Sequence, residues 1–324
     1  MSTIMFSRHS IAIFGPAFVF LAAALWATDA PFRSYLTEGL SSNFIVLAEH
    51  GVSLLIAIPI LLFNWADVRK LSLREWAAVL AIAIGGSALA SVAFTESFHY
   101  VNPSVSILLQ KVQPFIAITL AVLLLGEKLH KNFWLWSGGA LAGAYLISFP
   151  DLVPRLYAGE EFNPNTVGVL LALTAAVLWG ASTVLGKYVL RTAAFQTLTS
   201  LRFIIAFIFL AILTTTQHSF PSIASVTQTD WLFIVIIALT SGVFSLFLYY
   251  YGLQFTNASI ATIAELGFPL AAVFVNAYFI AQAPIPGAFL GLVTGQWIGT
   301  ALLLLAIIML SRVNEESAVA DVRS

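Results

Sequence analysis

Five ionisable side chains lie inside long apolar stretches of the sequence, namely Glu49, His50, Lys111, Arg202 and Glu265. A charged group at the centre of a membrane helix costs about 2.5–3.5 kcal/mol on insertion scales, so such a residue is expected to face protein or water. The chemistry open to this set is binding of a charged or polar solute, transfer of a proton, or a buried ion pair.

Lys111 and Glu265 are expected to approach the middle of the membrane from opposite sides. Lys111 follows Pro103 by eight residues, which is about 12 Å at a rise of about 1.5 Å per residue. Two interpretations are open. The pair forms a salt bridge that holds two halves together, or one or both residues contact a solute or carry a proton. Both hold if the pair opens and closes as a gate.

Two prolines, Pro114 and Pro269, follow polar residues by four positions within these stretches. Proline removes a backbone donor, so the carbonyls of Gln110 and Glu265 are expected to lack their helical partners. Free carbonyls of this kind are tolerated where they line a cavity. The alternative is a packing kink without solute contact.

Arg202 follows Thr199 by three residues, so both lie on one helical face. The guanidinium contacts solute, or it is a structural lock fixed to Glu49 or to backbone carbonyls. His50 is expected to be hydrogen-bonded within its helix. Candidate cavity walls are the indoles of Trp26 and Trp179 and the tyrosines at 249–251.

The composition indicates an integral membrane protein. Of 324 residues, 60% are hydrophobic and 9% are charged, and mean hydropathy is +0.95, whereas soluble domains carry about 25% charged residues. The net charge of −1 gives no indication of a nucleic-acid partner. The sequence has no cysteine and no metal-ligand spacing, so we expect no metal or cofactor.

The sequence indicates a duplicated unit. A shift of 155 residues places Asn102 on Asn257, Gln110 on Glu265, Pro114 on Pro269 and Glu127 on Gln282. Apolar runs of about 20 residues predict ten transmembrane helices, at about 11–29, 43–63, 75–97, 103–125, 132–150, 165–187, 195–214, 230–252, 258–280 and 286–310. We therefore expect an all-α membrane protein of two five-helix repeats, 11–150 and 165–310, with a cytoplasmic tail over 311–324.

The charges of the loops predict the orientation. With both termini in the cytoplasm, ten lysines and arginines lie on the inner side, and only Arg33 and Arg155 lie outside. The first span belongs to the repeat, because Trp26 matches Trp179, so we do not interpret it as a signal peptide. An odd number of spans per repeat inverts the second copy, as in many secondary transporters. The tail is expected to be disordered.

Glycines at four-residue spacing occur in the fifth and tenth spans, at 139 and 143 and at 291, 295 and 299. Small residues at this spacing let helices approach closely. They predict a seam between the two spans or a dimer surface.

Several of these features together resemble the EamA-type permeases of the drug/metabolite transporter superfamily. They are the ten spans, the ALW and VLW motifs ending at Trp26 and Trp179, TSLRFIIAF from 199 and QPFIAITLAVLLLGEKL from 113. The resemblance implies a ten-helix basket with a central cavity, alternating access and, commonly, export of amino acids and related metabolites. Gln282 departs from the family, which usually has a Gly-Glu pair at this place.

The predicted function is a secondary transporter that exports a small polar, amino-acid-like metabolite across a bacterial inner membrane. Proton coupling through Glu265 or Glu49 and facilitated exchange are both open. The alternatives are an importer of a carboxylate or sugar and a receptor-like or structural membrane protein. An enzyme is not expected, since HExxH, GxSxG and paired aspartates are absent.

Overall fold

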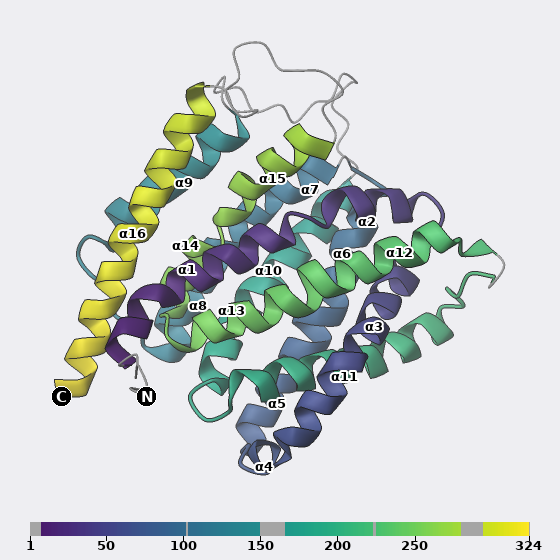
Figure 1. Cartoon of the computed structure of the whole chain (residues 1–324), viewed down its shortest axis with the longest axis horizontal. Coiled ribbons are helices and arrows are strands. Elements are labelled where there is room, and N and C mark those ends of the chain that lie inside the picture. The colour runs from purple at the N-terminus through teal and green to yellow at the C-terminus, as the bar shows by residue number, and fades with distance from the viewer. Residues whose placement is uncertain (1–7, 102, 150–165, 223–224, 280–293, 324) are drawn as a thin grey trace, which may run out of the picture.

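The computed structural model describes residues 8–101, 103–149, 166–222, 225–279 and 294–323, and these form helices without a β-strand (Figure 1). Eight helical segments among them are long and apolar enough to cross a membrane. A ninth, shorter apolar segment covers Ala258–Ala272. The all-helical membrane fold is therefore confirmed, whereas the described residues do not establish the count of ten spans.

The helices of the first half are α1 (Arg8–Trp26), α2 (Ala30–Thr37), α3 (Ser42–Phe63), α4 (Trp65–Val68), α5 (Leu73–Ala81), α6 (Ala90–Ser97), α7 (Pro103–Leu109), α8 (Gln113–Leu125) and α9 (Phe133–Ser148). Those of the second half are α10 (Thr166–Val189), α11 (Phe195–Thr216), α12 (Gln228–Ile237), α13 (Ser245–Gln254), α14 (Ala258–Ala264), α15 (Gly267–Phe279) and α16 (Thr294–Arg323).

Two predicted boundaries need correction. The first span continues beyond residue 29 as α2, which has a proline in its first turn, a position where the missing N–H is harmless. The tail expected to be disordered continues α16 as helix to Arg323. Residues 313–323 contain neither Pro nor Gly, so nothing in the sequence breaks that helix.

The two halves repeat their local structure as well as their sequence. A capping box begins α5 at Ser72 and Glu75, and another begins α12 at Thr227 and Asp230, 155 residues later. Both helices then pass into a π-helical stretch, Ile82–Leu89 in the first half and Ala238–Phe244 in the second. Such stretches are rare and frequently lie at functional sites.

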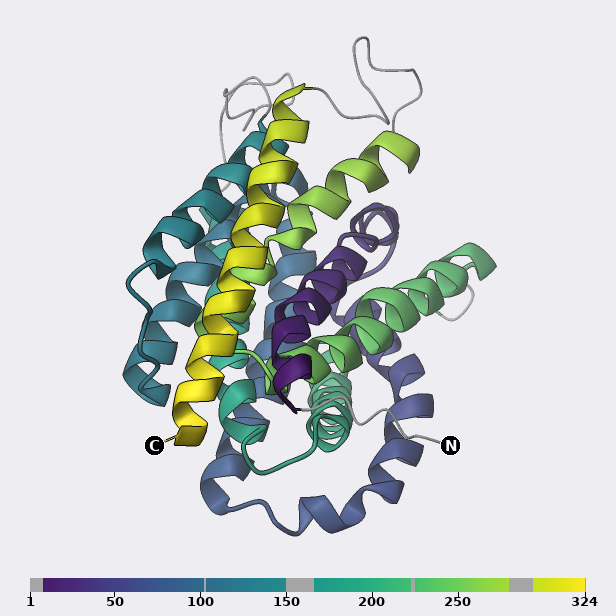
Figure 2. The ribbon, with the colours of Figure 1, turned by 60° about the vertical axis from the view of Figure 1, so that its left-hand side comes forward.

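Each half packs its first helix among the helices of the other half. Helix α1 of the first half packs against α13, α14, α15 and α16 of the second, while α10 of the second half packs against α5, α6, α7 and α8 of the first. Figure 2 shows α1 between α16 and the α12–α13 segment of the second half. The pairs α3–α11 and α9–α16 join equivalent helices, and α8 of the first half packs against α14 of the second. Neither half therefore has a complete core without the other.

Two charged residues hold the turn between α13 and α14. The ammonium of Lys187 donates to the carbonyls of Leu253 and Gln254, each at 3.0 Å. The carboxylate of Glu127 accepts from the backbone N–H groups of Ala258 and Ser259 at 2.7 and 3.0 Å. A cation at a helix C-terminus and an anion at a helix N-terminus both complement the helix dipole.

The predicted glycine seam joins α9 and α16. A Cβ atom added at Gly143 lies 2.7 Å from the carbonyl oxygen of Gly299, and one added at Gly299 lies 2.7 Å from that of Gly143. The two backbones thus meet at a distance that only glycine permits. The seam is confirmed at these two positions, while Gly291 lies outside the described residues.

We predict that Gly143→Ala lowers the stability of the protein by about 1–3 kcal/mol, because overpacking forces backbone shifts. Gly138→Ala on the same helix is the matched control, since a Cβ there meets nothing within 4 Å. Thermal unfolding in detergent measures both. Equal melting temperatures for the two variants contradict the seam.

Candidate functional site

A cavity of about 180 Å³ lies between the two halves. It is lined from both π-helical stretches, from α1, α3, α10, α11 and α13, and from the breaks between α7 and α8 and between α14 and α15. Nine of the ten residues predicted for the site line it, namely Trp26, Glu49, His50, Gln110, Lys111, Pro114, Trp179, Arg202 and Glu265. Pro269 is not among the lining residues. Whether these side chains bind solute stays a prediction.

Both proline breaks are present, but the expected free carbonyls are not. The chain turns through a 3-10 segment at Gln110–Val112, and the N–H of Gln113 donates to the carbonyl of Gln110. In the second half the N–H of Phe268 donates to the carbonyl of Glu265 at 3.0 Å. The prediction was wrong because the tighter turn, with bonds between residues three apart, replaces the bond that proline removes.

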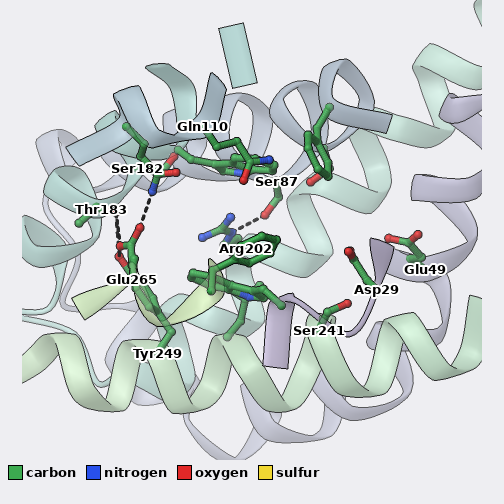
Figure 3. A pocket seen from close by; sticks show the side chains of 18 of the residues that line it. Asp29, Glu49, Ser87, Gln110, Ser182, Thr183, Arg202, Ser241, Tyr249 and Glu265 are labelled. Atoms are coloured by element: carbon green, nitrogen blue, oxygen red, sulfur yellow. Dashed lines mark hydrogen bonds between the residues drawn. The ribbon is translucent and has the colours of Figure 1, made fainter. Parts of the chain in front are cut away.

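The carboxylate of Glu265 is held by uncharged donors. It accepts hydrogen bonds from the side-chain amide of Gln113 at 2.5 Å, the hydroxyl of Tyr249 at 2.7 Å and the hydroxyl of Thr183 at 3.3 Å. Gln113 belongs to the first half and the other two residues to the second. Figure 3 shows Thr183 and Tyr249 beside Glu265. Glu265 thus joins the halves at the cavity wall without an ion pair.

Lys111 makes no ion pair with Glu265, so of the two open interpretations the salt bridge is absent from this structure. Its ammonium lies 5.2 Å from the centre of the Phe268 ring, a cation–π contact. Within the part of the chain that the structure describes, Lys111 has no hydrogen-bond or ion-pair partner.

Arg202 is buried and fixed by neutral groups. It donates to the hydroxyl of Ser87, to the hydroxyl of Tyr250 at 2.8 Å and to the carbonyl of Gly86 at 3.1 Å. The predicted lock to a backbone carbonyl is present, but Glu49 is not its partner. Figure 3 shows Arg202 between Glu265 on one side and Asp29 with Glu49 on the other.

The partner of Glu49 is Arg33, which the sequence placed in an outer loop. Arg33 lies in α2, is 5% exposed and pairs with Glu49 at 3.0 Å and with Asp29 at 2.9 Å. Its guanidinium also donates to Thr95 at 2.8 Å. Asp29 and Arg33 are four residues apart, a spacing that places a carboxylate beside a guanidinium on a helix, and this signal could have identified them.

Of the remaining predicted residues, His50 is held within its own helix, whereas Trp179 and Trp26 contact the opposite half. A ring nitrogen of His50 lies 2.8 Å from the carbonyl of Val46, as expected for a hydrogen-bonded histidine. The indole N–H of Trp179 donates to the carbonyl of Gly86 at 2.9 Å. The ring of Trp26 packs on Tyr249 with centroids 5.2 Å apart.

The site therefore combines aromatic walls with charges that are mostly neutralised inside the protein. Six aromatic side chains line it, Trp26, Phe94, Trp179, Phe203, Tyr249 and Phe268. Among the described residues no cluster of three His, Cys, Asp or Glu side chains could hold a metal ion. Such an arrangement is suited to binding a small organic solute with an aromatic face.

We predict that Glu49→Ala lowers stability by about 3 kcal/mol, because removing one partner of a buried pair leaves a poorly compensated charge. The matched control is Asp67→Ala, which removes the partner of Lys70, a residue whose side chain is 62% exposed. Exposed pairs contribute about 1 kcal/mol or less. Chemical or thermal unfolding compares the two, and equal losses contradict a structural role for the Arg33–Glu49 pair.

Comparisons with known proteins agree with this architecture. The model of the EamA-like transporter family matches residues 13–149 and again 166–312. The chain is 31% identical over 290 residues to the riboflavin transporter ImpX of Fusobacterium nucleatum, covering 86% of this chain and 95% of the relative. It is 25% identical over 312 residues to the uncharacterized transporter YwfM of Bacillus subtilis, covering 94% and 96%.

A solved crystal structure shares the fold, with a TM-score of 0.70 at 16% sequence identity, covering 92% of this chain and 97% of the other. Both halves match the family model, and relatives along nearly the full length are named as transporters. The chain belongs to the EamA-like transporter family and is a multi-pass membrane transporter.

Proposed function

We propose that the solute is a planar heteroaromatic molecule of the riboflavin class. The observation that carries the proposal is the aromatic lining of the cavity, because flat rings gain contact area and stacking energy against aromatic side chains. The 31% identity to a transporter named for riboflavin supports the same class. Polar groups at the walls, such as Gln110 and Ser91, can bind the polar edges of such a ring.

The amino-acid-like solute predicted from the sequence is the second candidate. It depends on Lys111 and Glu265 both being available to the charges of a zwitterion. Glu265 already accepts three hydrogen bonds from Gln113, Tyr249 and Thr183. A zwitterion therefore has to displace a formed network to reach this carboxylate, whereas a neutral ring does not.

Transport by alternating access is part of the proposal. Helices interrupted at the membrane midplane are the parts that bind solute in many inverted-repeat transporters, and both halves of this chain are interrupted at equivalent prolines. We also propose the inner membrane, cytoplasmic termini and outward transport. The orientation follows from the distribution of lysine and arginine. Ten of these residues are assigned to the inner side, and because Arg33 is buried in α2, Arg155 is the one basic residue left for the outer loops.

The test is thermal stabilisation of the purified protein by riboflavin, followed by transport of riboflavin in proteoliposomes. Binding to the folded state raises the melting temperature by mass action, so we expect a shift with riboflavin and none with amino acids, carboxylates or sugars. Stabilisation by an amino acid but not by riboflavin overturns the flavin class. Vesicles sorted by orientation, with and without a proton gradient, test direction and coupling.

We predict that Trp26→Ala weakens riboflavin binding about tenfold, because loss of one stacking surface removes about 1.4 kcal/mol. Trp26→Phe keeps an aromatic face and should keep most of the affinity. Trp134→Ala is the control, since this tryptophan on α9 is 58% exposed and does not line the cavity. Titration by quenching of flavin fluorescence measures all three, and an unchanged affinity in Trp26→Ala removes Trp26 from the site.

A further inference from the structure

The charges that line the cavity balance one another, and among the residues that the structure describes only one of these charges lacks a polar partner. The acidic residues are Asp29, Glu49 and Glu265, and the basic residues are Arg33, Lys111 and Arg202. Arg33 is paired with two carboxylates, Arg202 is bound by three neutral oxygens, and Glu265 accepts from three neutral donors. Lys111, within the described part of the chain, has only the ring of Phe268.

The repeat shows why this partner is missing. A shift of 155 residues places Gln113 on Phe268, and each of these residues reaches across to the break in the opposite half. Gln113 donates its amide to Glu265, whereas Phe268 offers Lys111 the face of a ring. Gln113 thus helps to satisfy the carboxylate, whereas among the described residues the three N–H donors of the ammonium have no acceptor.

An ammonium with unused donors beside an aromatic ring can bind a solute through that solute's acceptors. A desolvated lysine that donates to an oxygen or ring nitrogen forms a charge-assisted hydrogen bond, which is stronger than a neutral one. The Phe268 ring next to it can stack on the same solute. We propose that Lys111 selects the acceptor edge of a neutral heteroaromatic ring, an inference that rests on the proposed function and specifies its substrate further.

The same balance of charges disfavours a phosphorylated solute. A phosphate monoester carries about −1.5 to −2 charges at pH 7. Lys111 offers one positive charge, and the two guanidiniums of the cavity are already bound by side chains and backbone of the protein. A buried anion without enough paired cations is costly. The site should therefore take riboflavin and reject riboflavin 5′-phosphate.

The experiment titrates wild-type protein, K111M and K111R with three probes, riboflavin, lumiflavin and riboflavin 5′-phosphate, by flavin fluorescence. Lumiflavin has the ring system without the ribityl chain. Wild-type protein should bind the two neutral flavins and bind the 5′-phosphate at least about tenfold more weakly. K111M should weaken both neutral flavins by the same factor, about 10- to 100-fold, and K111R should retain most of the affinity.

Melting of the ligand-free variants separates a binding role from a structural one. Lys111 is half-buried and has no hydrogen-bond or ion-pair partner among the described residues, so its removal should leave the melting temperature of K111M unchanged or raise it. Loss of a structural contact lowers the melting temperature instead. K70M is the control for charge, because Lys70 is exposed and lies outside the cavity. Its affinity and stability should equal those of the wild type.

Several results overturn the inference while the proposed function stands. They are flavin binding by K111M equal to wild type, weakening of riboflavin without weakening of lumiflavin, a lower melting temperature of ligand-free K111M, and equal affinity of the wild type for riboflavin and its 5′-phosphate. A wild-type protein that binds none of the three probes overturns the proposed function and the inference together.

Discussion

The cost of a charge without a partner inside a membrane is the constraint on which this structure depends. Each ionisable side chain in a span has to be neutralised by protein or face a polar cavity. Here α2 packs into the helix bundle, and its Arg33 forms ion pairs with Glu49 and Asp29. For the same reason Arg202 donates hydrogen bonds to Ser87 and to a backbone carbonyl of the π-helical stretch. The polar cavity is the place where these satisfied charges meet.

The backbone obeys the same constraint. Within hydrocarbon every N–H and C=O must be paired inside the protein, and irregular backbone is tolerated only beside a cavity or inside the protein. Both interruptions at Pro114 and Pro269 close with bonds between residues three apart, and both lie at the cavity. The π-helical stretches contribute Ser87 and Ser241 to the same lining. Departures from regular helix are thus concentrated where the solute is proposed to bind.

Much of the fold could be predicted because hydropathy and duplication act over tens of residues. The apolar runs indicated the spans, and the matched prolines indicated the two breaks. The glycine spacing identified the seam at Gly143 and Gly299. Hydropathy cannot show a short helix that carries a buried arginine, since a window of about 20 residues averages α2 with the loop that follows. Arg33 was therefore assigned to the outside.

The site was predicted as a set of residues but not as a set of contacts. Nine of the ten named residues line the cavity, because ionisable groups in spans and positions matched by the repeat are each informative by themselves. Their partners depend on which helices adjoin. Glu265 is held by Gln113 of the opposite half, and no local pattern of sequence indicates that contact. Sequence reasoning therefore left open whether Lys111 pairs with Glu265, and this structure contains no such ion pair.

Duplication explains how one cavity can present two different walls. A strict repeat places identical side chains at both breaks, and such a site has no means of distinguishing the two edges of a solute. Divergence at three equivalent pairs, Gln110 with Glu265, Lys111 with Leu266 and Gln113 with Phe268, gives one wall a hydrogen-bonded carboxylate and the other a cation beside a ring. The backbone keeps the symmetry that positions both breaks, and the side chains break it where recognition requires an orientation.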